Sequence, residues 1–352
     1  MLQYLIILLD ASSTSYCHYE NLCKEKGLIA LEDLKKGIFF AMKENLMIQF
    51  VYPEIQLPEA YKEVIHTIDH SDIVPANCAD KELLANADVV VLNSWEEVAG
   101  MAWDGETCYV LRTAKKELFA EHKKLSAILK QVKRLNIVIT DMERFSEADF
   151  ETYRSVLASL AAEMEQMYAD GLSPQLNLLT DRMMLDKMNN CNAGWENITL
   201  APDGKFYVCP AFYQAQQKDG SEKTIGEECA KGFSTGDLKN GLDVKNAPLY
   251  QLNHAPLCRK CDAYQCRRCV WLNRKTTYEV NTPSHEQCVA AHLERNASRA
   301  LLNNIRKHGS FLPNMPEIKE ITYLGSAELI SGHRQRVADV TPHSDEVDKK
   351  PP

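Results

Sequence analysis

The chain has 352 residues, of which 45% are hydrophobic and 25% are charged, and its formal net charge is −9. This composition predicts a soluble globular protein with one large and one smaller domain. It argues against a membrane protein, because no apolar run approaches the roughly 20 residues of a membrane-spanning helix. It also argues against a nucleic-acid partner, because phosphate binding requires a basic surface.

The N-terminal stretch MLQYLIILLDASS has a short apolar run without a preceding Lys or Arg, and Asp10 follows this run directly. The pattern favours a buried first strand over a secretory signal. We therefore expect a cytoplasmic protein in a reducing compartment. There the 12 cysteines are expected to be metal ligands or free thiols rather than disulfides.

Short β-type runs alternate with helical patterns through residues 1–185, as in βα units that build a parallel sheet. The predicted strands are YLIILLD (4–10), LMIQFVY (46–52), DIVP (72–75), ADVVVLN (87–93), TCYVLRT (107–113), NIVITD (136–141) and QLNLLT (175–180). Strands in this number, with helices between them, predict an α/β fold in the form of a complete or partial (β/α) barrel.

Two of the intervening helices show a clear apolar face with helical spacing. The first face consists of Leu31, Leu34, Ile38 and Met42. The second helix has a start signal at Ser146 and Asp149 and a stop signal at Gly171. Its face consists of Phe150, Tyr153, Val156, Leu157, Leu160 and Met164. We expect both faces to pack on the sheet.

The pattern changes near residue 186 to loops that contain Gly, Asn and Cys. A hairpin is predicted from ENITLAP, a turn at Asp203-Gly204, and KFYVCP. A helix is predicted from near Ser284 to about Lys307, before Gly309. We assign 186–308 to a second domain. We assign 309–352 to an extension and a disordered tail, because the polar end RVADVTPHSDEVDKKPP finishes in proline.

Cysteines after residue 190 carry the main functional signal. The stretch CRKCDAYQCRRC (258–269) contains two Cys-x-x-Cys pairs, and such a pair lets two sulfurs of one tight turn reach the same metal. Basic residues in 259–275 either offset the negative charge of a thiolate-ligated metal or form a solvated loop. The candidate ligands are Cys191, Cys209, Cys258, Cys261, Cys266, Cys269 and Cys288.

Zinc is one alternative, since two Cys-x-x-Cys pairs can close a Cys₄ site. Zinc ribbons, however, usually separate the pairs by about 15 to 20 residues, whereas only the stretch DAYQ stands between these pairs. One zinc also leaves Cys191, Cys209 and Cys288 without a role. The candidate thiols suit two 4Fe-4S clusters better, one with four cysteine ligands and one with three cysteines and an open position.

The segment from Cys191 to Cys288 resembles the SPASM domain that follows radical SAM barrels in peptide- and protein-modifying enzymes. The match begins with Cys191, Gly204 and Cys209 and continues through the 258–269 block, with the last two gaps of the pattern each one residue shorter. The resemblance implies one auxiliary 4Fe-4S cluster on Cys258, Cys261, Cys266 and Cys288. It implies a second on Cys191, Cys209 and Cys269, whose fourth ligand stays open, with Cys229 as a candidate. An open iron there would bind a substrate thiolate.

The first half resembles radical SAM barrels in strand order and in the loop after the first strand, but it departs from their motifs. Those enzymes carry Cys-x3-Cys-x2-Cys in that loop, whereas this chain has SYCHYENLC, with Cys17, Cys23 and, as a substitute, His18. Their Gly-Gly-Glu-Pro becomes VYPEI, which keeps Glu54 but lacks the glycines that let backbone approach the cofactor. We therefore interpret Cys17 and Cys23 as a vestigial first-cluster site, with Glu54 as the remaining cofactor contact. We do not expect cleavage of S-adenosylmethionine.

Up to about residue 330 the chain resembles most closely the maturases associated with CXXX-repeat peptides. This resemblance implies a cysteine-rich, ribosomally synthesised precursor peptide as the partner, with its thiols placed or oxidised near the clusters. Two alternatives stay open. One is a non-enzymatic peptide-binding scaffold with a structural metal such as zinc; the other is an active radical SAM enzyme with an altered first site. The sequence assigns no catalytic residue and no oligomeric state.

The remaining candidates have simpler interpretations. His66 and His70 have the spacing of a shared helix face, but we interpret them as incidental, and we prefer Cys288 over His292 as a ligand. Cys78 and Cys108 are interpreted as buried or free thiols, as is Cys229 if it is not a ligand. Aromatic residues near the first two ligand cysteines are expected to form a small core that shields a cluster from water, with peptide binding as the alternative role. These residues are Trp195, Tyr207, Phe212 and Tyr213.

Overall fold

The computed structural model describes residues 2–21, 27–215 and 232–319. Its centre is one 11-stranded sheet in the order β11-β10-β9-β8-β1-β2-β3-β4-β5-β6-β7, and neighbours from β1 to β7 are parallel. The sheet is open, as in a partial barrel. All seven predicted strands are present, although the last, predicted at 175–180, ends at Leu176. Their bounds are β1 (Tyr4–Leu8), β2 (Met47–Val51), β3 (His70–Pro75), β4 (Val89–Leu92), β5 (Cys108–Thr113), β6 (Arg134–Ile139) and β7 (Gln175–Leu176).

Both faces of β1 and β4 are buried, which explains why these two strands are continuous apolar runs. Side chains alternate between the faces, so Leu5 and Ile7 of β1 enter the core beneath the helices. Ile6 and Leu8 enter a second core on the opposite, inner face. The inner core continues across the sheet through Val51, Ile73, Val91 and Val110.

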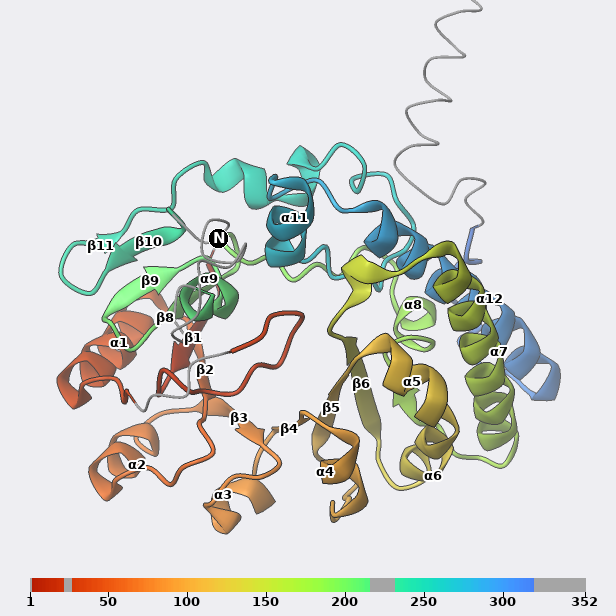
Figure 1. Cartoon of the computed structure of the whole chain (residues 1–352), viewed down its shortest axis with the longest axis horizontal. Helices are drawn as coiled ribbons and strands as arrows, with labels where there is room; N and C mark the ends of the chain where they lie inside the picture. Colours follow the sequence, from red (N-terminus) through yellow and green to blue (C-terminus); the bar gives the residue numbers. More distant parts are fainter. Residues whose placement is uncertain (1, 22–26, 216–231, 320–352) are drawn as a thin grey trace, which may run out of the picture.

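Helices cover the outer face of this sheet (Figure 1). Those α-helices are α1 (Leu31–Glu44), α2 (Glu59–Ile65), α3 (Lys81–Ala85), α4 (Trp95–Ala99), α5 (Lys115–Glu121), α6 (Leu125–Leu129), α7 (Glu147–Ala169) and α8 (Asp181–Met184). Short 3₁₀ turns η1 (His122–Lys124) and η2 (Met142–Arg144) lie between them. No described helix combines the length and the apolar composition that a membrane crossing requires.

The long helix α7 follows its prediction closely. Ser146 and Asp149 form a complete capping box at its start, and Gly171 beyond its end has a φ of 86°. Every predicted apolar residue of its face is buried, together with Met167. This helix therefore packs as the sequence pattern predicts.

The predicted face of α1 is wrong at Met42, whose side chain is 64% exposed. The helix instead buries Gly37 and Ala41 beside Leu34 and Ile38. A Cβ at position 37 would stand 2.3 Å from a methyl carbon of Leu200, so the helix approaches β8 (Asn197–Leu200) closely along this side and turns Met42 outward.

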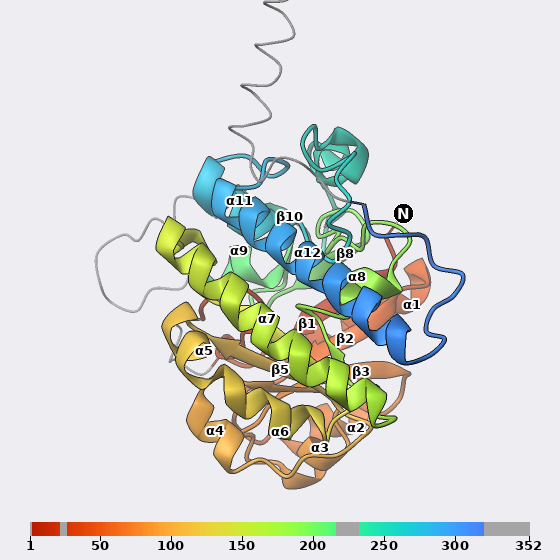
Figure 2. The same ribbon diagram turned by 90° about the vertical axis from the view of Figure 1, so that its right-hand side faces the viewer.

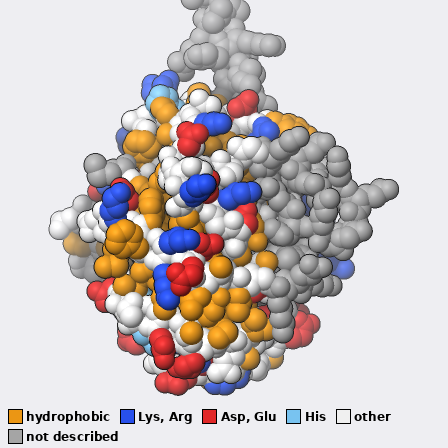
Figure 3. All heavy atoms as spheres, turned by 90° about the vertical axis from the view of Figure 1, so that its left-hand side faces the viewer, with side chains coloured by type: hydrophobic (Ala, Val, Ile, Leu, Met, Phe, Trp, Pro, Cys, Tyr) orange, Lys and Arg blue, Asp and Glu red, His pale blue; other side chains and the backbone are white. Residues whose placement is uncertain are grey.

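Exposed apolar side chains on α1 border a groove of about 640 Å³. The groove lies between α1 and the strands β10 (Ser234–Asp237) and β11 (Gly241–Leu242). On this side of the molecule, hydrophobic side chains are interspersed with charges of both signs (Figure 3).

The predicted hairpin is confirmed as β8 (Asn197–Leu200) and β9 (Lys205–Tyr207), with Gly204 at a φ of 75° in its turn. Strand β8 also pairs in parallel with β1, so the hairpin extends the barrel sheet. The chain then forms α9 (Pro210–Gln214), the 3₁₀ turns η3 (Ala247–Tyr250) and η4 (Leu252–His254), and α11 (Val270–Thr277).

The predicted C-terminal helix is confirmed as α12 (His285–His308), with Ser284 as its N-cap. It lies beside α7 (Figure 2). The buried hydroxyl of Tyr153 donates a 2.8 Å hydrogen bond to Glu294 across this contact. Most of the predicted disordered tail lies outside the described residues.

Candidate metal-binding site

Four cysteines belong to the core on the inner face of the sheet. Cys209 is a buried member of this core, and Cys17, Cys191 and Cys269 pack against it. We call these four residues the first thiol group. The sequence places Cys191, Cys209 and Cys269 in one set but assigns Cys17 to a separate site. The structure brings Cys17 from the loop after β1 to the other three.

Local structure positions these sulfurs. The N–H of Cys191 donates a 2.9 Å hydrogen bond to the carbonyl of Arg267, which ties the loop before β8 to the 258–269 block. Cys269 immediately precedes α11, and its Sγ accepts a 3.5 Å hydrogen bond from the N–H of Leu272. Amide donors at a helix start favour a negatively charged sulfur over a neutral one.

The thiols of this group act on one another electrostatically. Two causes raise the pKa of Cys269 to about 12. Burial is the larger cause, and the charge of Cys191 is the second. Burial also raises the pKa of Cys209 well above its ordinary value, with Cys269 and Cys191 as the next causes. The pKa of Cys17 is raised by burial first, then by Cys191 and Cys269. Such coupling requires the four side chains to be near neighbours.

A second thiol group consists of Cys258, Cys261, Cys266 and Cys288. Two tight turns hold the first three, because the N–H of Cys261 donates to the carbonyl of Cys258 at 3.0 Å and the N–H of Cys266 donates to that of Ala263 at 3.0 Å. Cys288 comes from the first turn of α12. The resemblance implies this same set for one cluster.

Burial and the charges of neighbouring thiols also raise the pKa values of cysteines in the second thiol group. Burial raises the pKa of Cys258 to about 11, and Cys261 contributes to the increase. Burial raises the pKa of Cys288 to about 12, followed by the effects of Cys258 and Cys261. The Sγ of Cys261 lies 3.5 Å from Nε2 of His292, so the histidine contacts the group as a neighbour.

Arg268 is a buried cation between the two groups. Its side chain is 1% exposed and its backbone has a φ of 46°. Burial lowers its pKa, while Cys258, Cys191 and Cys266, which come from both groups, act in the opposite direction. Its Nη2 donates to the carbonyl of Tyr250, whereas Nε and Nη1 have no hydrogen-bond partner among the described residues.

The donor set fits thiolate-ligated iron-sulfur clusters. Buried thiols stay protonated without a cation, and metal binding replaces their protons. The two unpartnered donors of Arg268 suit the negative sulfur surface that a cluster presents. In the part of the chain that the structure describes, no three His, Cys, Asp or Glu side chains converge on the position of a single metal ion. Cys23 and Cys229 lie outside the described residues.

Glu54 lies in a different place, a cavity of about 440 Å³. Residues that follow β1, β2 and β4 line this cavity, so it opens at the carboxyl ends of the strands. The lining residues are Ser12, Ser13, Thr14, Ser15, Glu20, Asn21, Glu54, Ile55, Asn93 and Arg112. Within the described residues the lining contains no cysteine, and Cys17 points elsewhere.

Arg112 organises this cavity and is absent from the sequence-based candidates. Its guanidinium is buried at the end of β5 and donates to Oδ1 of Asn93 at 2.6 Å. It also donates to the backbone carbonyls of Cys17 at 3.0 Å and Tyr19 at 2.6 Å. A charged residue at the carboxyl end of a buried parallel strand was the available signal for it.

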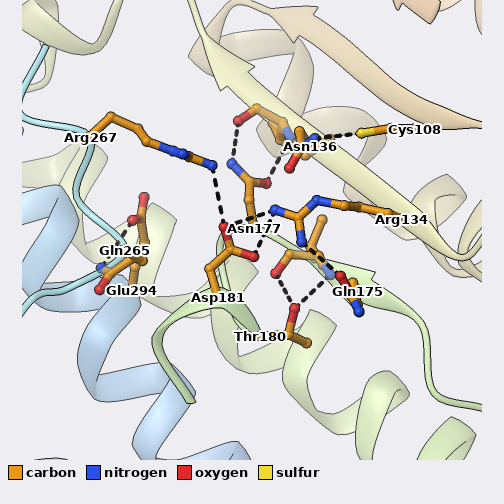
Figure 4. A network of polar contacts seen from close by, with 12 residues as sticks. Cys108, Arg134, Asn136, Gln175, Asn177, Thr180, Asp181, Gln265, Arg267 and Glu294 are labelled. Atoms are coloured by element: carbon orange, nitrogen blue, oxygen red, sulfur yellow. Dashed lines mark hydrogen bonds and ion pairs between the residues drawn. The ribbon is translucent and has the colours of Figure 1, made fainter. Parts of the chain in front are cut away.

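A polar network joins β6 and the segment after β7 to the 258–269 block (Figure 4). Arg134 of β6 donates to both carboxylate oxygens of the buried Asp181 at 3.0 Å. Arg267 approaches the same carboxylate at 3.6 Å. His18 lines a cavity together with Asn177 and Arg267 of this network, and its Nδ1 lies 3.0 Å from the carbonyl of Ile139. The network fixes the segment from which the second thiol group is built.

The structure places the remaining candidates as follows. His66 caps the C-terminus of α2 and His70 begins β3, so the two histidines do not share a helix face. Cys78 is buried, and Cys108 accepts a 3.1 Å hydrogen bond from Asn136. Aromatic residues near the first thiol group enter the inner core. Tyr207, Phe212 and Tyr213 are buried members, and Trp195 packs against them.

No protein-family model matches the sequence, and no curated protein matches it. Solved structures of anSMEcpe are similar. A histidine-tagged anSMEcpe with bound AdoMet has a TM-score of 0.56 and 12% identity, covering 87% of this chain and 96% of that chain. "Native anSMEcpe with bound AdoMet" has a TM-score of 0.55 and 13% identity, covering 86% and 99%. "Native anSMEcpe with bound AdoMet and Cp18Cys peptide" has a TM-score of 0.53 and 13% identity, covering 87% and 100%. The chain therefore has the fold of these anSMEcpe structures.

Proposed function

We propose that this chain is a peptide maturase whose two thiol groups hold two 4Fe-4S clusters near the thiols of a cysteine-rich, CXXX-repeat precursor peptide. The observation that carries the proposal is the gathering of all seven candidate ligands into two groups whose side chains are buried or partly buried. The similar fold of anSMEcpe, solved with AdoMet and with a Cp18Cys peptide, supports a peptide substrate. The proposal treats 1–185 as the barrel and 186–308 as the cluster-bearing domain.

Residues of the chain itself would shield the clusters from water and offset their negative charge. When bound, a 4Fe-4S cluster would supply an electron path for the oxidation of substrate thiols. The aromatic residues of the inner core exclude water from the first thiol group, and exclusion of water tunes a cluster's potential. The cationic Arg268 offsets the negative charge that thiolates and sulfides bring into the interior.

The cavity beside Glu54 marks where the radical SAM alternative would act. The anSMEcpe structures carry AdoMet, and this observation favours the alternative. The loop after β1 argues against it, because the thiol of Cys17 lies with the first thiol group rather than at the cavity. We therefore propose that maturation proceeds without reductive cleavage of S-adenosylmethionine.

The test uses the full chain, purified and reconstituted without oxygen, and a synthetic peptide with several CXXX repeats. We expect the peptide to bind and, with no AdoMet present, to lose two hydrogens for each disulfide that forms between two of its thiols. The two electrons pass through the clusters to an added oxidised viologen, and the two protons go to water. A matched peptide with every Cys replaced by Ser should keep its mass. A mass change that requires AdoMet and releases 5′-deoxyadenosine would instead establish the radical SAM alternative. Binding without any mass change, with zinc as the bound metal, would establish the scaffold.

A further inference from the structure

We propose that Cys17 is the fourth ligand of the cluster held by Cys191, Cys209 and Cys269, so that a residue of the barrel loop completes a metal site of the C-terminal half. This inference rests on the proposed function. It reassigns Cys17 from a vestigial first-cluster site to an auxiliary one, and it fills the ligand position that the sequence leaves open.

The position of Cys17 is the first argument. Its side chain packs on the inner core that contains Cys209, and Cys191 and Cys269 pack on this core as well. The cavity that holds Glu54 is lined by Ser12 to Ser15 and by Glu20 and Asn21, which flank Cys17 on both sides in the chain. The described lining omits Cys17 itself. Its side chain therefore lies on the inner core that the other three cysteines share, and not in the cavity.

The backbone around Cys17 is held in this orientation. Arg112 donates to the carbonyls of Cys17 and Tyr19 at 3.0 and 2.6 Å, and Arg112 is itself held by Asn93 at 2.6 Å. Tyr16 and Tyr19 meet edge to face at a ring distance of 6.0 Å, and Tyr19 is buried. A ligand on a fixed loop needs little rearrangement when a metal binds.

Hydrogen bonds join the segments that carry the four cysteines. The side chain of Gln214 in α9, which begins directly after Cys209, donates a 2.9 Å hydrogen bond to the carbonyl of Ser13 in the loop of Cys17. The N–H of Cys191 donates at 2.9 Å to the carbonyl of Arg267, two residues before Cys269. The four thiols thus form one set that a cluster would neutralise together.

Full ligation changes the role expected of this cluster. With Cys17 bound, each thiol group supplies four sulfurs, so no iron of the first cluster stays open for a substrate thiolate. The cluster would then act as an electron path and as a link that ties the loop after β1 to the C-terminal half.

Variants with single cysteine changes test the assignment. The full chain carrying Cys17→Ala, Cys269→Ala, both changes, or the control Cys108→Ala is reconstituted with iron and sulfide, and both elements are measured per chain. We expect Cys17→Ala and Cys269→Ala to lose the same half of the iron, and the double variant to lose no more than either alone. Cys108→Ala should keep the wild-type content, because Cys108 lies on β5 outside both thiol groups.

A second variant distinguishes the loss of a ligand from the loss of folding. Cys17→Ser keeps an oxygen that can ligate iron, so it should keep the wild-type iron content and change the electron paramagnetic resonance signal of only one reduced cluster. Wild-type iron and unchanged signals in both Cys17 variants would overturn the assignment, as would loss of half the iron in Cys23→Ala or Cys229→Ala but not in Cys17→Ala. A wild-type chain that takes up no sulfide would overturn the proposed function instead.

Discussion

The hydroxyl of Tyr153 in α7 donates a 2.8 Å hydrogen bond to the carboxylate of Glu294 in α12, and both side chains are buried. Glu294 also accepts a 3.4 Å hydrogen bond from Gln265, four residues before Cys269. This contact joins α7, the C-terminal helix and the cysteine block. A buried carboxyl group therefore contributes to the attachment of the cluster-bearing half to the barrel.

Glu294 should make stability depend on pH. Burial is the main cause that raises its pKa from 4.5 to about 7. The folded state then binds the proton more tightly than the unfolded state, so this group's contribution is full below pH 4.5 and is lost as the pH rises through about 7. At about 1.36 kcal/mol per pKa unit, the loss is about 3 kcal/mol.

The measurement compares urea unfolding of the wild type and Glu294→Gln from pH 4.5 to 8. Relative to the variant, the wild type should lose stability as the pH rises. The new amide can meet the side-chain carbonyl oxygen of Gln265, which has no hydrogen-bond partner among the described residues. Glu151→Gln, at an exposed glutamate of the same α7, is the control. A difference between the wild type and Glu294→Gln that stays constant with pH would contradict this interpretation.

The ion pair of Arg295 and Asp262 should contribute strongly to stability. The Arg295 side chain is fully buried and donates to both Asp262 oxygens at 3.0 and 3.1 Å. Arg295→Met leaves the Asp262 carboxylate buried without its cation, which should cost about 3–5 kcal/mol in the free energy of unfolding. Arg154→Met breaks the exposed pair with Glu151 and should cost less than about 1 kcal/mol. Equal losses in the two variants, measured by chemical denaturation, would refute the prediction.

Gly194 should not tolerate a side chain. Its φ is 81°, and an added Cβ would meet the Tyr250 ring at 2.9 to 3.1 Å. Gly194→Ala should therefore cost about 1–2 kcal/mol for the backbone and about 1–3 kcal/mol more for the overlap with the ring. Gly171→Ala is matched, because Gly171 has a φ of 86° with no described atom near its Cβ position, so it measures the backbone cost alone. Thermal unfolding that shifts equally in both variants would exclude the clash with Tyr250.

Arg268 should raise the reduction potentials of both proposed clusters. Hydrogen bonds and positive charge near cluster sulfurs favour the reduced state, and Arg268 has two unpartnered donors between the thiol groups, among the residues that the structure describes. Arg268→Met should therefore move both potentials to more negative values in a redox titration followed by electron paramagnetic resonance. Arg259→Met, at an exposed position beside Cys258, should leave them unchanged. A shift confined to one cluster would show that Arg268 does not act on both.

Local patterns in the sequence predicted the parts of the fold that depend on local structure. The seven parallel strands, the capping box of α7 and the 196–210 hairpin all follow from apolar runs and turn residues that lie close together in the chain. The face of α1 was predicted wrongly at Met42, because the contact that rotates the helix is with Leu200, far away in sequence. The pairing of β8 with β1 depends on long-range contacts in the same way.

The residues of the candidate site also divide into those that are close in the sequence and those that only the fold brings together. The resemblance to the SPASM domain implied one set of Cys258, Cys261, Cys266 and Cys288, and the first three of these residues share one short segment. It did not bring Cys17 to Cys191, since these residues meet only through the folding of the loop after β1 onto the inner core. Arg112 was missed for a related reason, because its partners Asn93, Cys17 and Tyr19 come from two other loops.

The most direct test of the central claim is the content of iron and acid-labile sulfide per chain after anaerobic purification and reconstitution. The account predicts about eight of each, as two 4Fe-4S clusters require. About one zinc per chain without sulfide, as in a structural Cys₄ site, would contradict it.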